Sequence, residues 1–349
     1  MNKKYLASAI VATSLLAVPA MAEVNLTAET ASAGGSTHLA PTHLTEIAGI
    51  QGIANIQLAE GQTLTNSIQN VAEGKTDIAS APHILPFLMS RGVGPYGKLG
   101  KEKGAELASN LRAIYPYTLG IFFLYAFDAK GVSGWDGLKG KTIFNGPPRG
   151  GALNNARTMI QLITGLKDGD GYEGLQSNWG QATATISGGQ PDAVVLPELF
   201  PNTRVSTIGS SGKITAWSMP KAAYEGEAMQ KYMKAPGSAP AELSVADLQK
   251  AVGDDWTFVS EDKTFRALAT IGGDVVHKDM DEELVYKLVK AYVGSLDALK
   301  AKAPFGNTVN YDNPALGMCG KNPIKYHKGA VRAWEEAGYD IPDCAEDNS

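Results

Sequence analysis

Residues 144–166 read FNGPPRGGALNNARTMIQLITGL and carry the pattern that decides the fold class. Residues 141–145 indicate the end of a short strand, and the glycines and prolines that follow force a turn. From Gly151 onward the apolar residues recur at helical spacing, at Leu153, Ala156, Met159, Ile160 and Ile163. The stretch therefore predicts a strand, a glycine-containing loop and the N-terminus of a helix.

The loop formed by Arg149, Gly150 and Gly151 has the features of an anion pocket. The first N–H groups of a helix have no intrahelical partner and carry partial positive charge, and glycine lets a ligand approach them closely. The Arg149 guanidinium adds a planar fork of donors. The same residues are also compatible with an ordinary turn and a solvent-facing arginine. Neither the phosphate-loop nor the dinucleotide glycine pattern is present, so the loop does not indicate a nucleotide.

A second loop of this kind lies near the start of the chain. Residues 24–31 alternate between apolar and polar side chains, which is typical of a half-buried strand. Residues 32–37 then lead into a helix, where Gly35 exposes the backbone and Ser36 and Thr37 are expected to cap the first turn. Two such loops, on separate halves of the chain, would hold a carboxylate from both sides if they faced each other.

Strands and helices alternate along the chain, which predicts a parallel α/β sheet with right-handed crossovers. Ligands of such sheets bind at the carboxyl ends of the strands. Ser80 ends one predicted strand and is therefore expected at the same edge as Gly35. The strands are expected at 24–31, 53–59, 78–81, 111–117, 119–127, 141–145, 175–178, 193–196, 204–208 and 265–271, and helices at 63–72, 151–164, 181–187, 279–302 and 323–338.

The pattern restarts after residue 138, which suggests two similarly built α/β domains. We expect domain I to comprise residues 23–125 and 265–349, and domain II residues 126–264, with crossing strands between them and the ligand cleft at their junction. Tyr117 lies where the first crossing strand passes this cleft, so its phenol either contacts ligand or fills the core. Glu198 follows the strand at 193–196 and either accepts a hydrogen bond from the ligand or is a solvated carboxylate at a helix start.

The first 22 residues have the pattern of a secretory signal peptide. Lys3 and Lys4 precede an apolar run, and Ala20-Met21-Ala22 is a small-x-small cleavage pattern. We therefore expect export, most simply into a bacterial periplasm. Without the two lysines the chain has 29 basic and 36 acidic residues, a formal charge of −7. This acidic balance, without a basic run, argues against nucleic acid as a partner.

Cys319 and Cys344 are the only cysteines, and in an exported chain they are candidates for a disulfide, with two free thiols as the alternative. No histidine lies at zinc-ligand spacing from either, and His38 and His43 are five residues apart, which is wrong for a shared helical face. The chain also lacks a Gly-x-Ser-x-Gly elbow. These patterns favour a binding protein over an enzyme, without a metal or cofactor.

Four segments carry a family resemblance: SAGGST at 32–37, GKTDIA at 74–79, LKGKTI at 138–143 with the loop that follows, and PIKYHKGA at 323–330 with Glu336 and Gly338. On these the chain resembles the TAXI family, the periplasmic receptors of one class of tripartite ATP-independent (TRAP) transporters. Two segments depart from the family pattern. The second loop reads PPRGG at 147–151, and His38 and Leu39 replace an aromatic pair.

The resemblance implies a type II periplasmic-binding fold that delivers a small carboxylate or amino-acid-like ligand to TRAP membrane permease subunits. A sensor that signals to a membrane kinase, or an exported enzyme on a related fold, would be the alternatives. We expect a monomer, with Arg149 as the anchor of the ligand's anionic group. The expected ligand contacts are Gly35, Ser36, Thr37, Ser80, Tyr117, Arg149, Gly150, Gly151 and Glu198.

Overall fold

The computed structural model describes residues 24–31, 33–148 and 151–347. The predicted signal peptide at 1–22 lies outside the described residues. Within the described part of the chain, no helix combines the length and the apolar character needed to cross a membrane.

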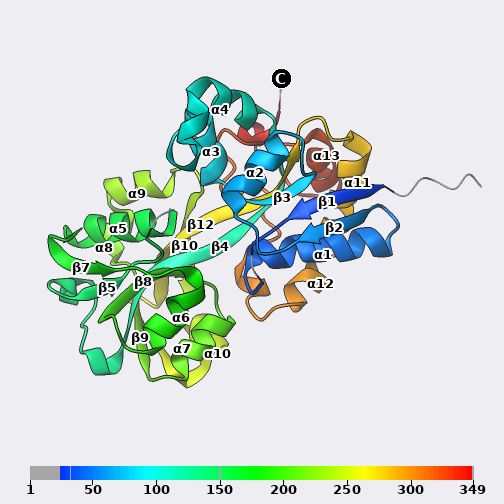
Figure 1. The fold of residues 1–349 in the computed structure, drawn as a ribbon. Helices are drawn as coiled ribbons and strands as arrows, with labels where there is room; N and C mark the ends of the chain where they lie inside the picture. The colour runs from blue at the N-terminus through cyan, green and yellow to red at the C-terminus, as the bar shows by residue number, and fades with distance from the viewer. Residues whose placement is uncertain (1–23, 32, 149–150, 348–349) are drawn as a thin grey trace, which may run out of the picture.

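The chain forms two α/β lobes, seen at the upper right and lower left of Figure 1. The first lobe contains β1 (Asn25–Glu29), α1 (Ser36–Ile50), β2 (Asn55–Ala59), α2 (Leu64–Ala72), β3 (Ile78–Pro82), α3 (Ile84–Arg91), α4 (Gly100–Ser109), α11 (Glu282–Val293), α12 (Leu296–Ala301), β13 (Lys325–Tyr326) and α13 (Lys328–Glu336). Strand β1 pairs in parallel with both β2 and β3, as the alternating pattern predicted.

The second lobe is also built from alternating strands and helices. It contains β5 (Thr142–Phe144), α5 (Gly151–Thr164), β6 (Lys167–Asp168), β7 (Gly171–Leu175), α6 (Trp179–Ser187), β8 (Ala193–Glu198), α7 (Thr203–Gly209), β9 (Ile214–Trp217), α8 (Lys221–Glu225), α9 (Glu227–Met233), β10 (Ser238–Ser244), α10 (Val245–Val252) and β11 (Trp256–Val259). Strand β5 pairs in parallel with β7 and β8.

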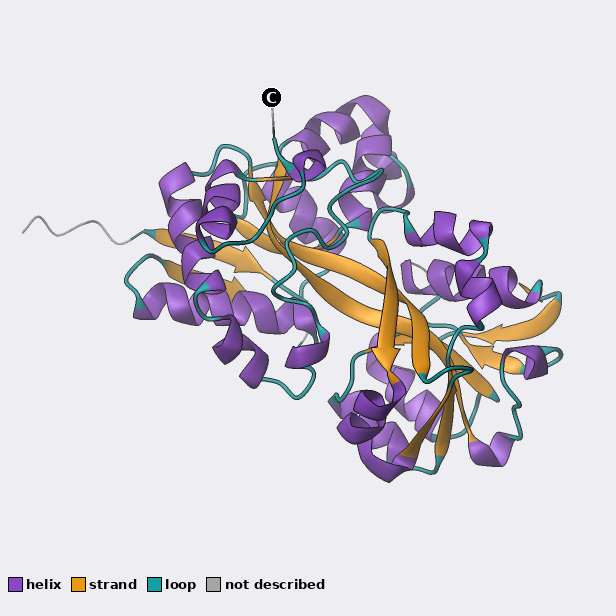
Figure 2. Ribbon diagram, turned by 180° about the vertical axis from the view of Figure 1, so that it is seen from behind, coloured by secondary structure: helices purple, strands orange, loops and turns teal. Residues whose placement is uncertain are grey.

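Two long antiparallel strands, β4 (Leu111–Phe127) and β12 (Thr264–His277), run through both lobes (Figure 2). The strand order is β2-β1-β3-β12-β4-β8-β5-β7-β6. The predicted fold class of two α/β domains joined by crossing strands is confirmed. The expected division at residues 125/126 and 264/265 falls inside β4 and beside the start of β12, and it stays a prediction.

The register of the crossing strands brings the two carboxyl edges toward each other. Pro82, at the end of β3, pairs with Gly272, which pairs in turn with Tyr117 of β4. Glu198, at the end of β8, pairs with Ile121 of the same strand. Strand β3 runs parallel to β4 and β8 runs antiparallel to it, so their ends point at one another. The two edges are separated by four residues of β4, about 13 Å of extended chain.

The lobes also touch directly beside this junction. Leu199, which follows β8, packs into the apolar core of the first lobe. Thr308 Oγ1 donates a hydrogen bond of 3.2 Å to the Phe200 carbonyl. Gly120 of β4 lies close against β8, because a Cβ atom there would come within 3.0 Å of Pro197 Cβ. The junction is therefore packed at its base.

Several predicted elements differ from the structure. The helix predicted at 323–338 begins only at Lys328, because residues 325–326 form strand β13, which pairs with β4. The strand predicted at 265–271 extends from Thr264 to His277. Residues 204–208, predicted as a strand, belong to helix α7, which Asn202 caps by accepting a hydrogen bond from the Val205 N–H. The strand predicted at 175–178 is β7, which ends at Leu175. The helix predicted at 279–302 is broken between Val293 and Leu296. It starts at Glu282, where Asp281 caps α11 by accepting a hydrogen bond from the Leu284 N–H.

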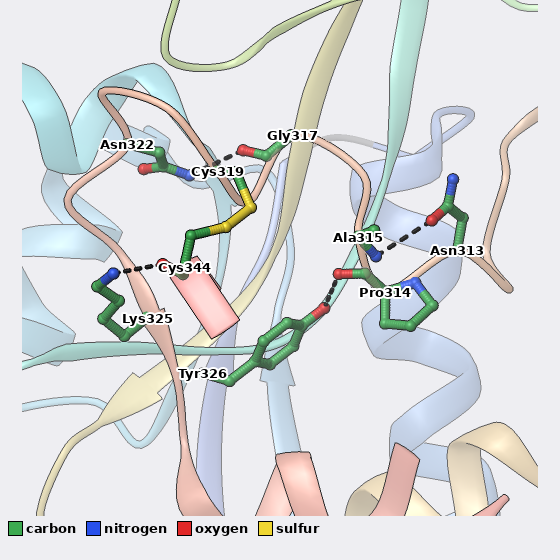
Figure 3. The surroundings of a disulfide bond; sticks show 9 residues. All are labelled: Asn313, Pro314, Ala315, Gly317, Cys319, Asn322, Lys325, Tyr326 and Cys344. Atoms are coloured by element: carbon green, nitrogen blue, oxygen red, sulfur yellow. Dashed lines mark hydrogen bonds between the residues drawn. A yellow bond between two sulfur atoms is a disulfide. The ribbon is translucent and has the colours of Figure 1, made fainter. Parts of the chain in front are cut away.

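The C-terminal segment is fastened by a disulfide between Cys319 and Cys344, whose Cα atoms lie 5.6 Å apart (Figure 3). Asn322 Nδ2 donates to the Gly317 carbonyl, and Tyr326 Oη donates to the Pro314 carbonyl at 2.7 Å. The Lys325 ammonium binds the carbonyl of Cys344 itself. The segment that returns to pair β13 with β4 is thus held by both covalent and polar contacts.

Candidate ligand-binding site

Helix α1 begins at the carboxyl edge of the first lobe with its N-terminus uncapped by any side chain. Gly35 occupies the N-cap position in extended conformation, and no side-chain hydrogen bond caps the turn. The prediction that Ser36 and Thr37 cap this helix is wrong, because both already belong to its first turn. The first N–H groups of α1 therefore have no side-chain acceptor among the described residues, which leaves the positive end of the helix dipole available to an anion.

The first turn of α1 also has open space for a ligand and an unused hydrogen-bond donor. A Cβ atom added to Gly34 would meet nothing within 4 Å, and one added to Gly35 would meet only Thr37 Oγ1 at 3.8 Å. Ser36 is 1 % exposed, and its hydroxyl has no hydrogen-bond partner among the described residues. A buried hydroxyl without a partner is costly in a folded protein. A ligand oxygen at this turn would supply the missing acceptor.

A proline inside α1 leaves one carbonyl of this first turn free to bind side chains from the neighbouring strands. Pro41 has no N–H, so the Thr37 carbonyl lacks the hydrogen bond that a helix normally provides at the fourth residue onward. The side chains of two neighbouring strand ends replace it. Thr30, after β1, donates its hydroxyl to the Thr37 carbonyl, and Ser80 Oγ of β3 lies 2.7 Å from the same oxygen.

Ser80 connects the start of α1 to a buried carboxylate on the crossing strand β12. Asp274 is fully buried and accepts hydrogen bonds from Tyr115 Oη at 2.7 Å, Tyr117 Oη at 2.7 Å and Ser80 Oγ at 2.9 Å. Among the described residues no basic side chain forms an ion pair with it. Burial raises the pKa of Asp274 to about 6, and the hydrogen bonds from Tyr117, Tyr115 and Ser80 offset part of that effect.

The structure thus joins two of the predicted ligand contacts, Ser80 and Tyr117, in one hydroxyl network around Asp274. Both side chains are completely buried, and each hydroxyl has a protein partner. Burial, reinforced by the nearby carboxylate, raises the pKa of Tyr117 well above its usual value, so this phenol stays a donor. Their direct contact with a ligand stays a prediction.

The second lobe presents a buried ion pair at the facing edge. Glu198 is 1 % exposed, and its carboxylate accepts a fork of hydrogen bonds from Arg204 Nε and NH2, at 3.0 Å and 2.7 Å to Oε2. Tyr125 Oη donates to the other carboxylate oxygen at 3.0 Å. The alternative that Glu198 is a solvated carboxylate is wrong. Its contact with a ligand stays a prediction, since both oxygens already have protein donors.

Arg204 also stacks on an exposed aromatic ring. Its guanidinium carbon lies 5.2 Å from the ring centre of Trp179, the first residue of α6, which is 44 % exposed. Burial disfavours the charged guanidinium, but the adjacent Glu198 outweighs it and raises the pKa of Arg204. A rigid indole and a permanently charged arginine therefore lie together at the carboxyl edge of the second lobe.

The loop before α5 holds the predicted anion anchor. Arg149 and Gly150 lie outside the described residues, so their expected contacts are not tested. Gly151 is the exposed first residue of α5, with open space where a Cβ atom would lie. Asn145, just before the loop, is buried and accepts a hydrogen bond of 2.7 Å from Gln176 Nε2. This contact ties the ends of β5 and β7 together beneath the loop.

Sequence reasoning missed Asp274 and Arg204. Asp274 interrupts the apolar run of β12, at 264–277, and a lone acid in such a run is a signal for a buried carboxylate. The second crossing strand was expected to end at Ile271, before this residue. Arg204 was assigned to a strand, although Asn202 before it has the form of a helix N-cap. Its position six residues after Glu198 gave no signal of an ion pair.

A polar cavity of about 360 Å³ lies elsewhere, at the outer end of the crossing strands. It is lined by Arg112, Lys278, Asp279, Met280, Glu282, His327, Lys328 and Asp347. Its basic and acidic side chains balance, and the Arg112 guanidinium is bound to Asp347 at 2.7 Å. Across the described residues, no group of three or more acidic, histidine or cysteine side chains is placed to hold a metal ion.

Comparison with solved structures finds periplasmic binding proteins at low similarity. The sulfonate-binding protein SsuA of Methylobacillus flagellatus is 13 % identical, covering 80 % of this chain and 69 % of its own, with a TM-score of 0.43. The sulphonate-binding SsuA of Escherichia coli is 15 % identical, with 55 % and 58 % covered and a TM-score of 0.40. A periplasmic substrate-binding protein of Coxiella burnetii is 14 % identical, with 82 % and 98 % covered and a TM-score of 0.42. Likeness at this level identifies neither a ligand nor an activity.

A search of curated protein sequences gives no match. The scan against family models matches residues 29–338, which include both lobes and both crossing strands. The match covers the α1 turn, the Asp274 network and the ion pair of Glu198. This chain belongs to the NMT1-like family.

Proposed function

We propose that this chain is an exported solute-binding protein that captures a small organic anion between the carboxyl edges of its two lobes. The observation that carries the proposal is the start of α1. There an uncapped helix N-terminus, open space at Gly34 and Gly35, and a buried Ser36 hydroxyl without a partner converge. An anionic oxygen would satisfy the hydroxyl and the free N–H groups together.

The second lobe supplies the other side of the proposed site. Its edge carries the start of α5, which Arg149 precedes in the sequence, and the Trp179 and Arg204 pair at the starts of α6 and α7. We propose Arg149 as the anchor for the anion and the Trp179 ring as a contact for its carbon skeleton. Hinge motion in the crossing strands would close the lobes on the ligand, as in other two-domain receptors.

The proposed ligand is a carboxylate or amino-acid-like compound, and the proposed destination is a TRAP-type membrane permease in the manner of TAXI receptors. The four sequence segments that resemble that family support this assignment. The signal peptide pattern at residues 1–22 supports a periplasmic location. Uptake of labelled ligand into vesicles that contain a TRAP permease, driven by an ion gradient without ATP, would test the delivery step.

Ligand capture is tested by thermal unfolding of residues 23–349 with a panel of small carboxylates, amino acids and alkanesulfonates. A compound that binds only the folded chain raises the unfolding midpoint. Ser36→Ala should weaken a true ligand roughly tenfold or more, because it removes one hydrogen bond to a charged group. The matched control is Ser187→Ala, since the Ser187 hydroxyl is also buried without a partner but lies at the far end of α6.

The panel also separates the anion classes. Stabilisation by alkanesulfonates alone would replace the carboxylate assignment while keeping the site. Equal loss of binding in the Ser36 and Ser187 variants would argue against the α1 turn as the binding end. Turnover of a bound compound, seen by mass spectrometry, would contradict a pure receptor.

A further inference from the structure

We propose that Asp274 is a positioning residue for the start of α1, and that its proton decides how firmly that turn is held and how well it accepts an anion. The proposal rests on the proposed function for its binding step, but its structural step can be tested without any ligand. It concerns a residue on the crossing strand β12, where the ladder with β4 is irregular between Asp274 and Val275.

The network contains one hydrogen atom that two acceptors share. Ser80 Oγ lies 2.9 Å from Asp274 Oδ1 and 2.7 Å from the Thr37 carbonyl, yet its hydroxyl has a single hydrogen to donate. When Asp274 is ionised, its charge makes it the stronger acceptor, and Ser80 donates to it. The Thr37 carbonyl then keeps only the hydroxyl of Thr30.

Protonation of Asp274 reverses this arrangement. The neutral carboxyl group must itself donate, and Ser80 Oγ at 2.9 Å is within reach as acceptor. Ser80 then turns its hydrogen to the Thr37 carbonyl, so the first turn of α1 gains a second hydrogen bond. The carboxyl group meanwhile keeps the Tyr115 and Tyr117 hydroxyls as donors to its remaining lone pairs.

The same proton changes the electrostatics of the turn. An ionised Asp274 lies two short hydrogen bonds below the Thr37 carbonyl, and in a buried setting its field opposes an anion at the start of α1. Protonation removes that opposition. Binding of an anion should therefore be accompanied by uptake of a proton, and affinity should fall as the pH rises through the range in which Asp274 ionises.

The ionisable groups packed around Asp274 have pKa values shifted away from that of Asp274, so we expect Asp274 to be the group that changes charge there. Tyr115 and Tyr117 of β4, Tyr292 of α11 and Tyr311 all have pKa values raised by burial, so they stay neutral. His83 follows β3, and burial lowers its pKa to about 4. His43 of α1, whose ring contacts Tyr292, also has a pKa lowered to about 4, by burial and by Lys302.

One further histidine lies at the turn itself. His38 Nε2 is 3.0 Å from Glu60 Oε1, on the outer side of α1. An ionisable side chain this close to the turn contributes to the binding of an anion there independently of Asp274, so a control variant is needed. His38→Gln removes that contribution and is made alongside the Asp274 variant.

The ligand-free test measures hydrogen exchange of the peptide covering residues 36–44 in the full mature chain at pH 5 and pH 7.5, corrected for intrinsic rates. We expect the wild type to lose roughly threefold or more of its protection between the two pH values, since one hydrogen bond to the turn is lost. Asp274→Asn, which cannot ionise, should show no such change, and Ser80→Ala should abolish it by removing the shared hydrogen. Asp312→Asn, in a half-buried pair with Lys300, is the matched control.

The binding test titrates the same variants calorimetrically with L-glutamate and ethanesulfonate, one probe for each anion class. Wild-type affinity should fall roughly fivefold or more from pH 5 to pH 7.5, and buffers of different ionisation heat should report proton uptake. Asp274→Asn should flatten the profile, leaving only the part that His38→Gln removes.

The outcomes separate the two proposals. If neither probe binds the wild type, the proposed function fails for these anions, while the exchange experiment still decides the role of Asp274. If Asp274→Asn keeps the wild-type exchange difference, or keeps the wild-type slope of affinity against pH, the role assigned to Asp274 is overturned.

Discussion

Each lobe buries one carboxylate near the junction, and the two are satisfied in opposite ways. Glu198 in the second lobe is bound by the forked guanidinium of Arg204 and by one phenol, Tyr125. Asp274 in the first lobe is equally buried but is bound only by neutral hydroxyls. A paired cation fixes the charge of a buried acid, whereas hydroxyl donors stabilise the charge only in part. We therefore expect Glu198 to keep its charge, whereas the protonation state of Asp274 can change.

The largest expected effect comes from breaking the charged pair. Arg204→Ala leaves Glu198 buried without its cation and should lower the free energy of unfolding at pH 7 by about 3–5 kcal/mol. Urea denaturation measures it. The double variant Glu198→Gln with Arg204→Met should recover most of the loss, because no charge is then left buried. Equal losses in the single and double variants would show that the arginine acts through packing alone.

The hydroxyl-bound acid should instead make stability depend on pH. The folded pKa of Asp274, about 6, lies above the value of about 3.9 in an unfolded chain, so its stabilising contribution is complete below pH 4. That contribution is lost as the pH rises through 6. Relative to Asp274→Asn, the wild type should lose about 2 kcal/mol between pH 4 and pH 7. A difference between the two proteins that stays constant with pH would contradict this expectation.

Removing one phenol from each carboxylate sharpens the contrast. Tyr117→Phe should cost about 1–2 kcal/mol at pH 7 and should move the loss of stability at Asp274 to higher pH, because that hydroxyl lowers the acid's pKa. Tyr125→Phe should cost about 1 kcal/mol, with Arg204 still holding Glu198. Denaturation series from pH 4 to pH 8 compare them. The same pH profile for both variants would mean that the two acids do not differ as described.

The smallest expected effect isolates the donor that does not depend on Asp274. Thr30→Val removes the hydroxyl that binds the Thr37 carbonyl and should cost about 1 kcal/mol at pH 7. At pH 5 the cost should be smaller, because Ser80 then donates to the same carbonyl. Thermal unfolding at the two pH values tests it. A larger cost at pH 5 would reverse the proposed direction of the Ser80 hydrogen.

The alternation of strands and helices was sufficient to predict the two lobes, because each βα unit carries its own periodic pattern. The loops at Gly35 and Gly151 were located from composition alone. Residues 204–208 could not be assigned correctly, since Val205 and Ile208 are spaced as in a helix but the segment is too short for the period to be decisive. The break after Val293 depends on how the end of α11 packs, and the apolar stripe there continues unbroken in the sequence.

The sequence predicted at which strand ends the candidate site lies, but not which side chains are hydrogen-bonded to one another there. Ser80 and Tyr117 were chosen because they end or cross strands at the expected edge, and the structure does bring them together, within 3.3 Å. Their common partner Asp274 lies 157 residues beyond Tyr117 and pairs with Tyr115 only through the register of β12. Pairing between distant strands is set by the whole sheet, so local patterns do not contain it.

Pro41 gives α1 a property that a regular helix would not have. Because Pro41 has no N–H, the Thr37 carbonyl is not used for a hydrogen bond inside the helix. It accepts hydrogen bonds from the Thr30 and Ser80 hydroxyls instead. Pro41→Ala would restore the N–H that donates to the Thr37 carbonyl within the helix. The start of α1 would then depend less on its hydrogen bond to Ser80, which links it to Asp274 of β12. If the start of α1 binds the ligand as proposed, restoring this one backbone N–H would make ligand affinity independent of the protonation of Asp274.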